Sequence, residues 1–346
     1  MRAKVFSINN TFQYLLFIIT IGFLTGCSKG NEPEDKSASF GIYLLEDQSI
    51  TWEDLKTRNL DSLKLKDWIT GDKIDFYDYS THVIYLNVDY NTLFSVPHND
   101  NTPFVVVANE KRCYYGRFSP PQDTTQPHVV IKPLYDCDDL LMLEFNPLNR
   151  KDIRFNDNIK SSLNELGKIK LGFNSEFPSV RFYEVPGTTD TILEIFVVLK
   201  NDDEEVLYAP HLYGIINAGG REYSSKLLVY NNISCFIMPV IPYYSSSLIY
   251  TLRTNRILRG QYAYCHLTLP KEEKWNYSVC DFPLSKIPPG EYNCIIEYYG
   301  MLGGSKETRY APKGRMWTGY LRTNTISISY DGVKGIVVKN KYVSLN

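Results

Sequence analysis

Residues 283–298 read Pro-Leu-Ser-Lys-Ile-Pro-Pro-Gly-Glu-Tyr-Asn-Cys-Ile-Ile-Glu-Tyr, a proline-rich turn that leads into a strand. Around this stretch, from about residue 168 to 331, strand-like runs alternate with turn residues. They predict strands at 180–185, 192–199, 205–209, 212–216, 227–230, 234–241, 248–252 and 261–269. Residues 326, 328 and 330 are apolar or aromatic and alternate with polar ones, which predicts a late strand with one buried face. The C-terminal part therefore reads as all-β.

The turn at 288–292 resembles the Pro-Gly-x-Tyr start of a late strand in immunoglobulin-like sandwiches. In that pattern the tyrosine hydroxyl bonds back to the preceding corner, two residues before a cysteine, as Tyr292 and Cys294 are placed here. The usual partner cysteine and core tryptophan are not at the expected spacing. The resemblance implies a looser immunoglobulin-like β-sandwich over residues 168–346, with Tyr292 as its structural corner.

Residues 39–167 predict a small α+β domain. Strands are expected at 40–45, 81–88, 103–108, 112–118, 129–134 and 140–145. Thr51 followed by Asp54 approximates a capping box, which predicts a helical stretch there. Asn156-Asp157 predicts the cap of a closing helix that ends at Gly167. The fold class is therefore mainly β, with an α+β domain followed by a sandwich.

Three segments of this first domain resemble a group of uncharacterised bacterial lipoproteins. They are 40–45, the Asp75–His82 segment and 103–107, which match a Phe-x-Ile-Tyr-Leu-like strand, an Asp-Ile-x-x-Tyr-Asp-x-x-x-His-like segment and a Pro-Phe-Val-Val-Val strand. The likeness covers about a third of the chain. It supports the lipoprotein and domain predictions without implying an activity.

The first 27 residues predict export and lipid attachment. Arg2 and Lys4 precede an apolar run of about eleven residues, 14–24, which is short of the roughly 20 that span a bilayer as a helix. Leu24-Thr25-Gly26-Cys27 resembles the lipobox of bacterial lipoproteins, which implies cleavage before Cys27 and a lipid on its sulfur. Residues 1–26 are then the signal peptide, and 27–38 a charged, flexible tether. A plain secretory signal or an uncleaved anchor is the alternative.

Location follows from the same segment. A multiply acylated cysteine anchors a protein stably, so the partner predicted at this end is a membrane of the cell envelope. Ser28 after Cys27 is not the aspartate that retains some lipoproteins at the inner membrane. The outer membrane is therefore favoured if the cell has two membranes.

Composition limits the possible partners. The chain has 37 basic and 39 acidic residues, and loss of Arg2 and Lys4 with the signal peptide moves the net charge from −2 to −4. This balance argues against a nucleic-acid partner, which requires a basic excess. The 27 tyrosines suit a β-rich fold, and alternatively a face that binds sugar or protein.

Six cysteines remain besides Cys27, and none has Cys-x-x-Cys spacing. An even number in an exported chain permits disulfides. Cys113–Cys137 and Cys280–Cys294 are expected as local pairs; free, buried cysteines are the alternative.

No catalytic or metal-binding motif is present. The five histidines, at 82, 98, 128, 211 and 266, lack metal-ligand spacing, and no Gly-x-Ser-x-Gly elbow or phosphate-binding loop occurs. The acidic run 136–139 lacks EF-hand spacing, and 201–205 is expected to cap a hairpin with solvated charge. No catalytic residue, metal or cofactor is predicted.

The leading hypothesis is a non-catalytic envelope lipoprotein that displays loops or an aromatic face to a glycan or an envelope protein. A structural component of envelope assembly is the second. A hydrolase without a recognisable motif is the third, because the separation of paired carboxylates is a tertiary property.

Overall fold

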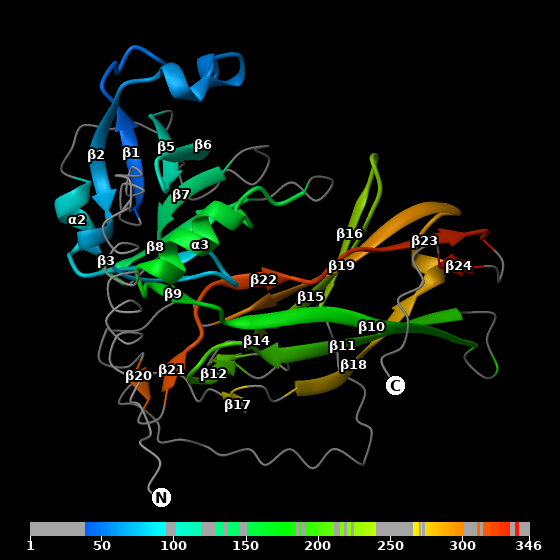
Figure 1. Cartoon of the computed structure of the whole chain (residues 1–346). Coiled ribbons are helices and arrows are strands. Elements are labelled where there is room, and N and C mark those ends of the chain that lie inside the picture. Colours follow the sequence, from blue (N-terminus) through cyan, green and yellow to red (C-terminus); the bar gives the residue numbers. More distant parts are fainter. Residues whose placement is uncertain are drawn as a thin grey trace, which may run out of the picture. The chain divides into compact units, whose positions relative to one another are not determined.

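The structure of the protein is a computed structural model. It describes residues 39–94, 102–118, 129–134, 137–145, 151–184, 187, 191–210, 215–217, 220–222, 225–239, 266–269, 271, 274–300, 310–311, 314–332 and 336–338. The predicted signal peptide, Cys27 and the tether lie outside these residues. Ala38–Asn346 forms one compact unit, and its described part is mainly β (Figure 1).

The N-terminal part is a nine-stranded mixed sheet with the order β2-β1-β5-β6-β7-β8-β4-β3-β9. Its strands are β1 (Phe40–Leu45), β2 (Leu65–Thr70), β3 (Ile74–Asp78), β4 (Val83–Leu86), β5 (Pro103–Ala108), β6 (Lys111–Phe118), β7 (Val129–Pro133), β8 (Leu140–Glu144) and β9 (Ile169–Lys170). Neighbouring strands are antiparallel except β6–β7 and β3–β9, which are parallel. The predicted strands of this part are confirmed, while β2 and β3 were not predicted.

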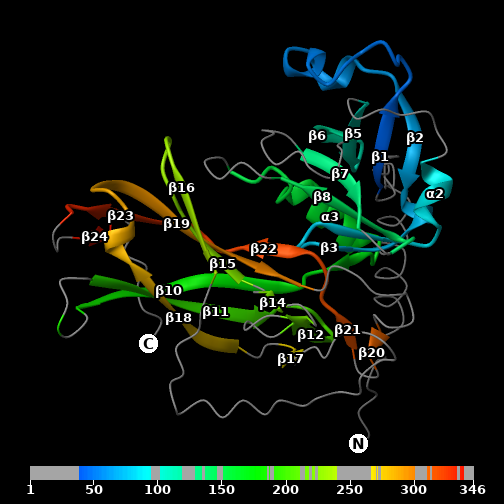
Figure 2. The same ribbon diagram turned by 180° about the vertical axis from the view of Figure 1, so that it is seen from behind.

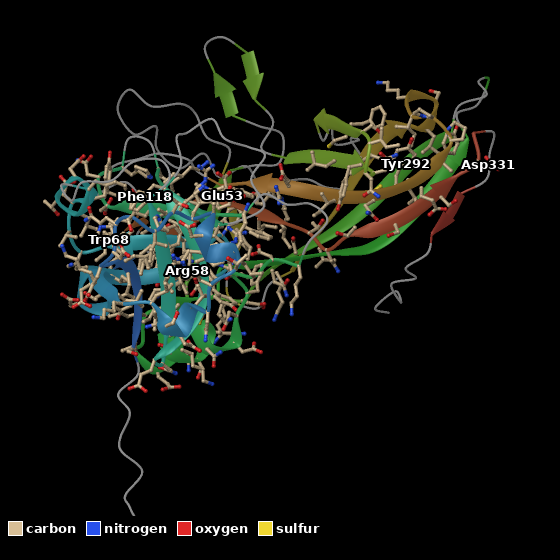
Figure 3. The ribbon with its side chains drawn as sticks, turned by 90° about the horizontal axis from the view of Figure 1, so that it is seen from above. Glu53, Arg58, Trp68, Phe118, Tyr292 and Asp331 are labelled. Carbon is tan, nitrogen blue, oxygen red and sulfur yellow. The ribbon has the colours of Figure 1, made fainter. Side chains whose placement is uncertain are left out.

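Both faces of this sheet are buried, which explains the apolar runs in its strands. Phe104 and Val106 of β5 belong to the main core cluster, whereas Val105 packs in a cluster on the other face. The main cluster includes Trp68 and Phe118, whose ring centroids lie 4.9 Å apart (Figure 3). Because successive side chains of a strand point to opposite faces of the sheet, β5 contributes residues to two separate cores.

Helix α3 (Asp157–Glu165) closes this part, as predicted, and contacts β1, β5 and β6. The Asn156 side chain accepts a hydrogen bond from the Asn158 backbone N–H, 2.9 Å away. At the other end Gly167 has φ 64°, and Lys168 N–H donates to the Leu163 carbonyl across the terminus. A short helix, α2 (Tyr90–Leu93), precedes β5.

The predicted helical stretch near residue 51 is only two 3₁₀ turns, η1 (Asp54–Lys56) and η2 (Leu60–Ser62). The capping pair itself forms, since Thr51 N–H and Oγ donate to Asp54 Oδ2 at 2.8 Å. A cap satisfies only the first turn, and a helix this short is marginal without further support, so the segment forms 3₁₀ turns instead. A third turn, η3 (Gly71–Lys73), joins β2 to β3.

The described C-terminal strands form four sheets (Figures 1 and 2). One sheet has the order β10 (Phe173–Glu184), β11 (Thr191–Asn201) and β18 (Lys274–Pro283). A second has the order β17 (His266–Leu269), β12 (Val206–Pro210), β21 (Gly314–Met316) and β20 (Tyr310–Ala311). A third pairs β13 (Ile215–Asn217) with β14 (Gly220–Glu222). The largest contains β16 (Cys235–Pro239), β15 (Ser225–Tyr230), β19 (Gly290–Tyr299), β23 (Ile326–Tyr330) and β24 (Ile336–Val338), with β22 (Tyr320–Arg322) also on β19. The turn η4 (Leu284–Lys286) precedes β19.

The predicted strands here are found in part. Strand β10 begins at Phe173, earlier than predicted, and β23 has the expected alternating burial. The predicted strand at 248–252 lies outside the described residues.

Contacts cross the predicted boundary between residues 167 and 168. Strand β9 pairs with β3 in the N-terminal sheet. Tyr320 of β22 lies in a core cluster with Phe76, Val83 and Leu140 from the N-terminal sheet. The two predicted parts thus share a core.

Candidate functional site

The turn between β3 and β4 is the point on which distant segments converge. Asp78 Oδ1 accepts hydrogen bonds from Ser80 N–H (3.0 Å), Ser80 Oγ (2.6 Å) and Thr81 N–H (3.3 Å). His82 N–H donates to the Asp78 carbonyl at 2.8 Å, and His82 has a left-handed φ of 56°. The Asp78 carboxylate therefore accepts hydrogen bonds from backbone N–H groups of the turn that have no backbone acceptor, and so holds the turn in one conformation.

C-terminal residues pack directly on this turn. Trp317 Nε1 donates to Ser80 Oγ at 2.9 Å, across 237 positions of sequence. Gly319 has φ 100°, and a Cβ there would lie 2.8 Å from Thr81 Cβ. A side chain at 319 would clash with the turn, so this close approach requires glycine.

A buried guanidinium on β21 links the same turn to the turn between β11 and β12. Arg315 Nη2 of β21 lies 2.7 Å from Asp78 Oδ2 and 2.7 Å from Asp203 Oδ2. The three side chains are 1%, 0% and 2% exposed. The Arg315 guanidinium also lies 5.4 Å from the centroid of the Phe76 ring. The expectation that 201–205 carries only solvated charge is wrong for Asp203, because Arg315 buries and neutralises it.

His82 is buried at the edge of the same region. Its Nδ1 lies 2.8 Å from Tyr77 Oη, and the Phe155 ring packs edge-on at 4.5 Å. Burial, reinforced by the Arg154 guanidinium, holds the pKa of His82 well below its ordinary value. The imidazole is therefore neutral at physiological pH.

This burial predicts acid sensitivity. Because the pKa of His82 is depressed in the folded state, the unfolded chain binds one more proton below about pH 6.5. The free energy of unfolding should fall by up to about 1.4 kcal/mol per pH unit below that point, and be independent of this group above it. Urea unfolding between pH 5 and 8 measures the slope. Asparagine tolerates a left-handed φ, so His82→Asn should fold and should lose the part of the pH dependence that His82 causes. An unchanged slope in this variant would show that His82 does not cause the pH dependence.

Beside the turn lies a cavity of about 310 Å³. Its apolar lining is formed by Phe145, Phe155, Ile295, Tyr320 and Leu321. Its polar lining is formed by Ser80, Asp152, Arg154, Arg322 and residues 323–325. This volume lies at the lower limit of small-ligand sites, which span about 300–1,000 Å³.

Each arginine of the cavity carries its own counter-charge. Arg154 Nε lies 2.9 and 3.1 Å from the two carboxylate oxygens of Asp152. Burial alone would raise the pKa of Asp152, but this ion pair outweighs it and lowers the pKa. Arg322 Nε and Nη2 both lie 2.7 Å from Glu297 Oε1 on neighbouring β19.

The same guanidinium groups are also fixed to the end of β8. Arg322 Nη1 donates to the Phe145 carbonyl at 3.1 Å, and Arg154 Nη1 donates to the Leu143 carbonyl. Burial raises the pKa of Tyr320 to about 12, so its hydroxyl stays protonated. The polar groups of the cavity are therefore held in place, and each is either uncharged, like the Tyr320 hydroxyl, or paired with an opposite charge, like Arg154 and Arg322.

Neither predicted disulfide is formed. None of Cys113, Cys137 and Cys294 is in a disulfide bond in the structure. Cys113 packs on the main core cluster and Cys137 in the cluster on the opposite face, so the sheet separates them. Cys280 and Cys294 lie on β18 and β19, which belong to different sheets. Burial raises the pKa of Cys294, in keeping with a cysteine that packs as a small hydrophobe.

Tyr292 makes the bond that its resemblance implies. Its Oη donates to the Pro288 carbonyl at 2.9 Å, and the side chain is 4% exposed. Figure 3 places Tyr292 near the end of the C-terminal strands that also holds Asp331.

The other sequence candidates do not gather at the cavity. Asp138 and Asp139 use their backbone carbonyls to accept from Tyr90 and Leu86. His98, His128 and His211 lie outside the described residues. Within the described ranges, no three His, Cys, Asp or Glu side chains are grouped so that they could hold a metal ion.

Several cavity residues had no sequence motif to mark them. Arg154, Phe155 and Asn324 lie in loops without a recognisable pattern. The one available clue was Phe155, an aromatic residue beside the polar cap of α3.

Across the described part of the chain, no helix is both long and apolar enough to cross a membrane. Comparisons with protein-family models, curated proteins and solved structures found no match to this chain.

Proposed function

We propose that this protein is a lipid-anchored, non-catalytic binding protein of the cell envelope. Its attachment point is Cys27, in the lipobox-like Leu24-Thr25-Gly26-Cys27, and its location is the outer membrane in a cell with two membranes. The charged segment after Cys27 would act as the tether between the membrane and the compact unit.

The observation that carries the proposal is the cavity beside the β3–β4 turn. Its charged side chains are held by internal ion pairs and by backbone carbonyls, so little conformational entropy is lost when a ligand enters. A pre-organised cavity that mixes apolar and polar groups suits recognition of a glycan or of a protein side chain.

The test uses the full-length protein purified in detergent and applied to glycan arrays and to arrays of envelope proteins. Retention of a defined glycan or protein is the expected result. No retention on either array would overturn the binding function. Cleavage of a retained glycan would instead support a hydrolase, and a stable stoichiometric neighbour after crosslinking in cells would support an assembly component.

We also propose that the strands from β10 onward form an immunoglobulin-like sandwich. The support is the Tyr292–Pro288 hydrogen bond at the start of β19, two residues before the buried Cys294. The bond links the strand to its preceding turn, as a tyrosine corner does.

The corner predicts a measurable loss of stability. Tyr292→Phe should lower the free energy of unfolding by about 1 kcal/mol, because the Pro288 carbonyl loses its hydrogen-bond donor. Tyr330→Phe on neighbouring β23 is the matched control, and should change stability by less. Urea unfolding measures both; equal effects would show that the corner bond contributes nothing specific.

A further inference from the structure

We propose that the cavity beside the β3–β4 turn binds a neutral, hydroxyl-rich ligand, namely an uncharged saccharide unit. The inference rests on the proposed binding function and specifies its ligand class. It depends on three features of the cavity: its charge balance, its aromatic rim and its neutral polar segment.

The charge balance excludes an anionic ligand as the preferred occupant. Arg154 is paired with Asp152, and Arg322 with Glu297. An incoming carboxylate or phosphate would have to compete with these carboxylates, and would also meet their repulsion. A neutral hydroxyl avoids that cost, since it can donate to a carboxylate oxygen and accept from a guanidinium N–H together.

The aromatic rim is provided by Phe155. Its side chain is 49% exposed although it is large and apolar. The ring is nevertheless fixed from behind, because it packs edge-on against Tyr79 at 5.4 Å and against His82 at 4.5 Å. A fixed, exposed aromatic face offers apolar area to the C–H face of a sugar ring at small entropic cost.

The neutral polar segment is 323–325, between β22 and β23. Thr323, Asn324 and Thr325 all line the cavity and carry hydroxyl or amide groups. Thr323 Oγ1 accepts from Ile296 N–H at 3.0 Å, which fixes the segment to β19. Such groups both donate and accept, as sugar hydroxyls do.

The volume sets the size of the ligand. About 310 Å³ lies at the lower limit of small-ligand sites, which span about 300–1,000 Å³. The cavity therefore takes one sugar unit or the end of a glycan, rather than a long segment of one.

The experiment measures binding of full-length protein in detergent to immobilised neutral glycans (glucans, mannans and N-acetylglucosamine oligomers) and to anionic ones (polygalacturonate and dextran sulfate). Neutral glycans should be retained, with little change between 50 and about 500 mM salt because no net charge is neutralised. Phe155→Ala should weaken that binding about tenfold. Asn324→Ala should also weaken binding of neutral glycans. Because this second variant removes a polar group from a different part of the cavity, it shows that the loss in Phe155→Ala does not come only from damage to the fold.

The matched control is Ile233→Ala, since Ile233 is an exposed apolar residue, 95% accessible, that does not line the cavity. Its binding should equal that of the unaltered protein. Retention of anionic glycans alone, with loss at high salt, would overturn the inference, as would neutral binding that neither Phe155→Ala nor Asn324→Ala affects. Binding of envelope proteins without any glycan would overturn this inference while leaving the proposed function intact; no binding on any array would overturn both.

Discussion

Replacing Arg315 with methionine is expected to lower the free energy of unfolding by about 3–5 kcal/mol. The substitution leaves the carboxylates of Asp78 and Asp203 buried, at 0% and 2% exposure, without the cation that lies 2.7 Å from each. It also removes the contact that holds β21 to the β3–β4 turn. Urea unfolding of the full-length protein, followed by tryptophan fluorescence, measures the loss.

Two further variants test the cause of this loss. Lys271→Met breaks an ion pair with Glu204 whose side chains are 44% and 79% exposed, so its effect should stay below about 1 kcal/mol. Adding Asp78→Asn and Asp203→Asn to Arg315→Met removes the uncompensated charges and should recover part of the stability. A loss below about 1 kcal/mol for Arg315→Met would show that the buried pairs do not hold the two parts together.

Replacing Cys27 with serine is expected to abolish both lipid attachment and processing. A serine hydroxyl cannot form the thioether on which the lipoprotein prediction depends, and the predicted cleavage between Gly26 and Cys27 depends on that modification. Cells given an alkyne-tagged fatty acid should therefore label the unaltered protein and leave Cys27→Ser unlabelled. The variant should also keep residues 1–26, which mass spectrometry of the intact protein detects.

Cys113→Ser is the control, because Cys113 is a free thiol of β6 within the compact unit. It should be labelled and processed like the unaltered chain. Equal labelling of Cys27→Ser and the unaltered protein would disprove the anchor. A mature form of Cys27→Ser cut at another position would favour the plain secretory signal instead.

Much of the N-terminal sheet could be predicted from the sequence because its elements depend on local patterns. Strand β5 has the bounds that were expected, and α3 has its predicted cap and its glycine end. Strands β2 and β3 were missed because Leu65–Thr70 and Ile74–Asp78 mix charged residues with apolar ones. Leu65–Thr70 and Ile74–Asp78 become strands because they pair with β1 and β4, respectively.

The candidate site could be predicted far less well. Asp203 lies in an acidic run that resembles a solvated turn, and the residue that buries it, Arg315, is 112 positions away. His82 showed no metal-ligand spacing, and nothing local indicated that Phe155 would cover it. The cysteines were paired by proximity in sequence, whereas the sheet places Cys113 and Cys137 on opposite faces.

The sequence by itself determined the β-rich class, the cap of α3 and the tyrosine before Cys294, and it is the sole basis of the prediction that Cys27 is an anchor. These depend on residue type and on spacings of a few positions, because hydrogen bonds and periodic faces act over short chain separations. Only the tertiary structure decided which carboxylates Arg315 neutralises, that Trp317 reaches Ser80, and that the β22 and β8 regions enclose a cavity with Phe155 at its rim. Those outcomes depend on burial and charge pairing between segments that come together only when the chain folds.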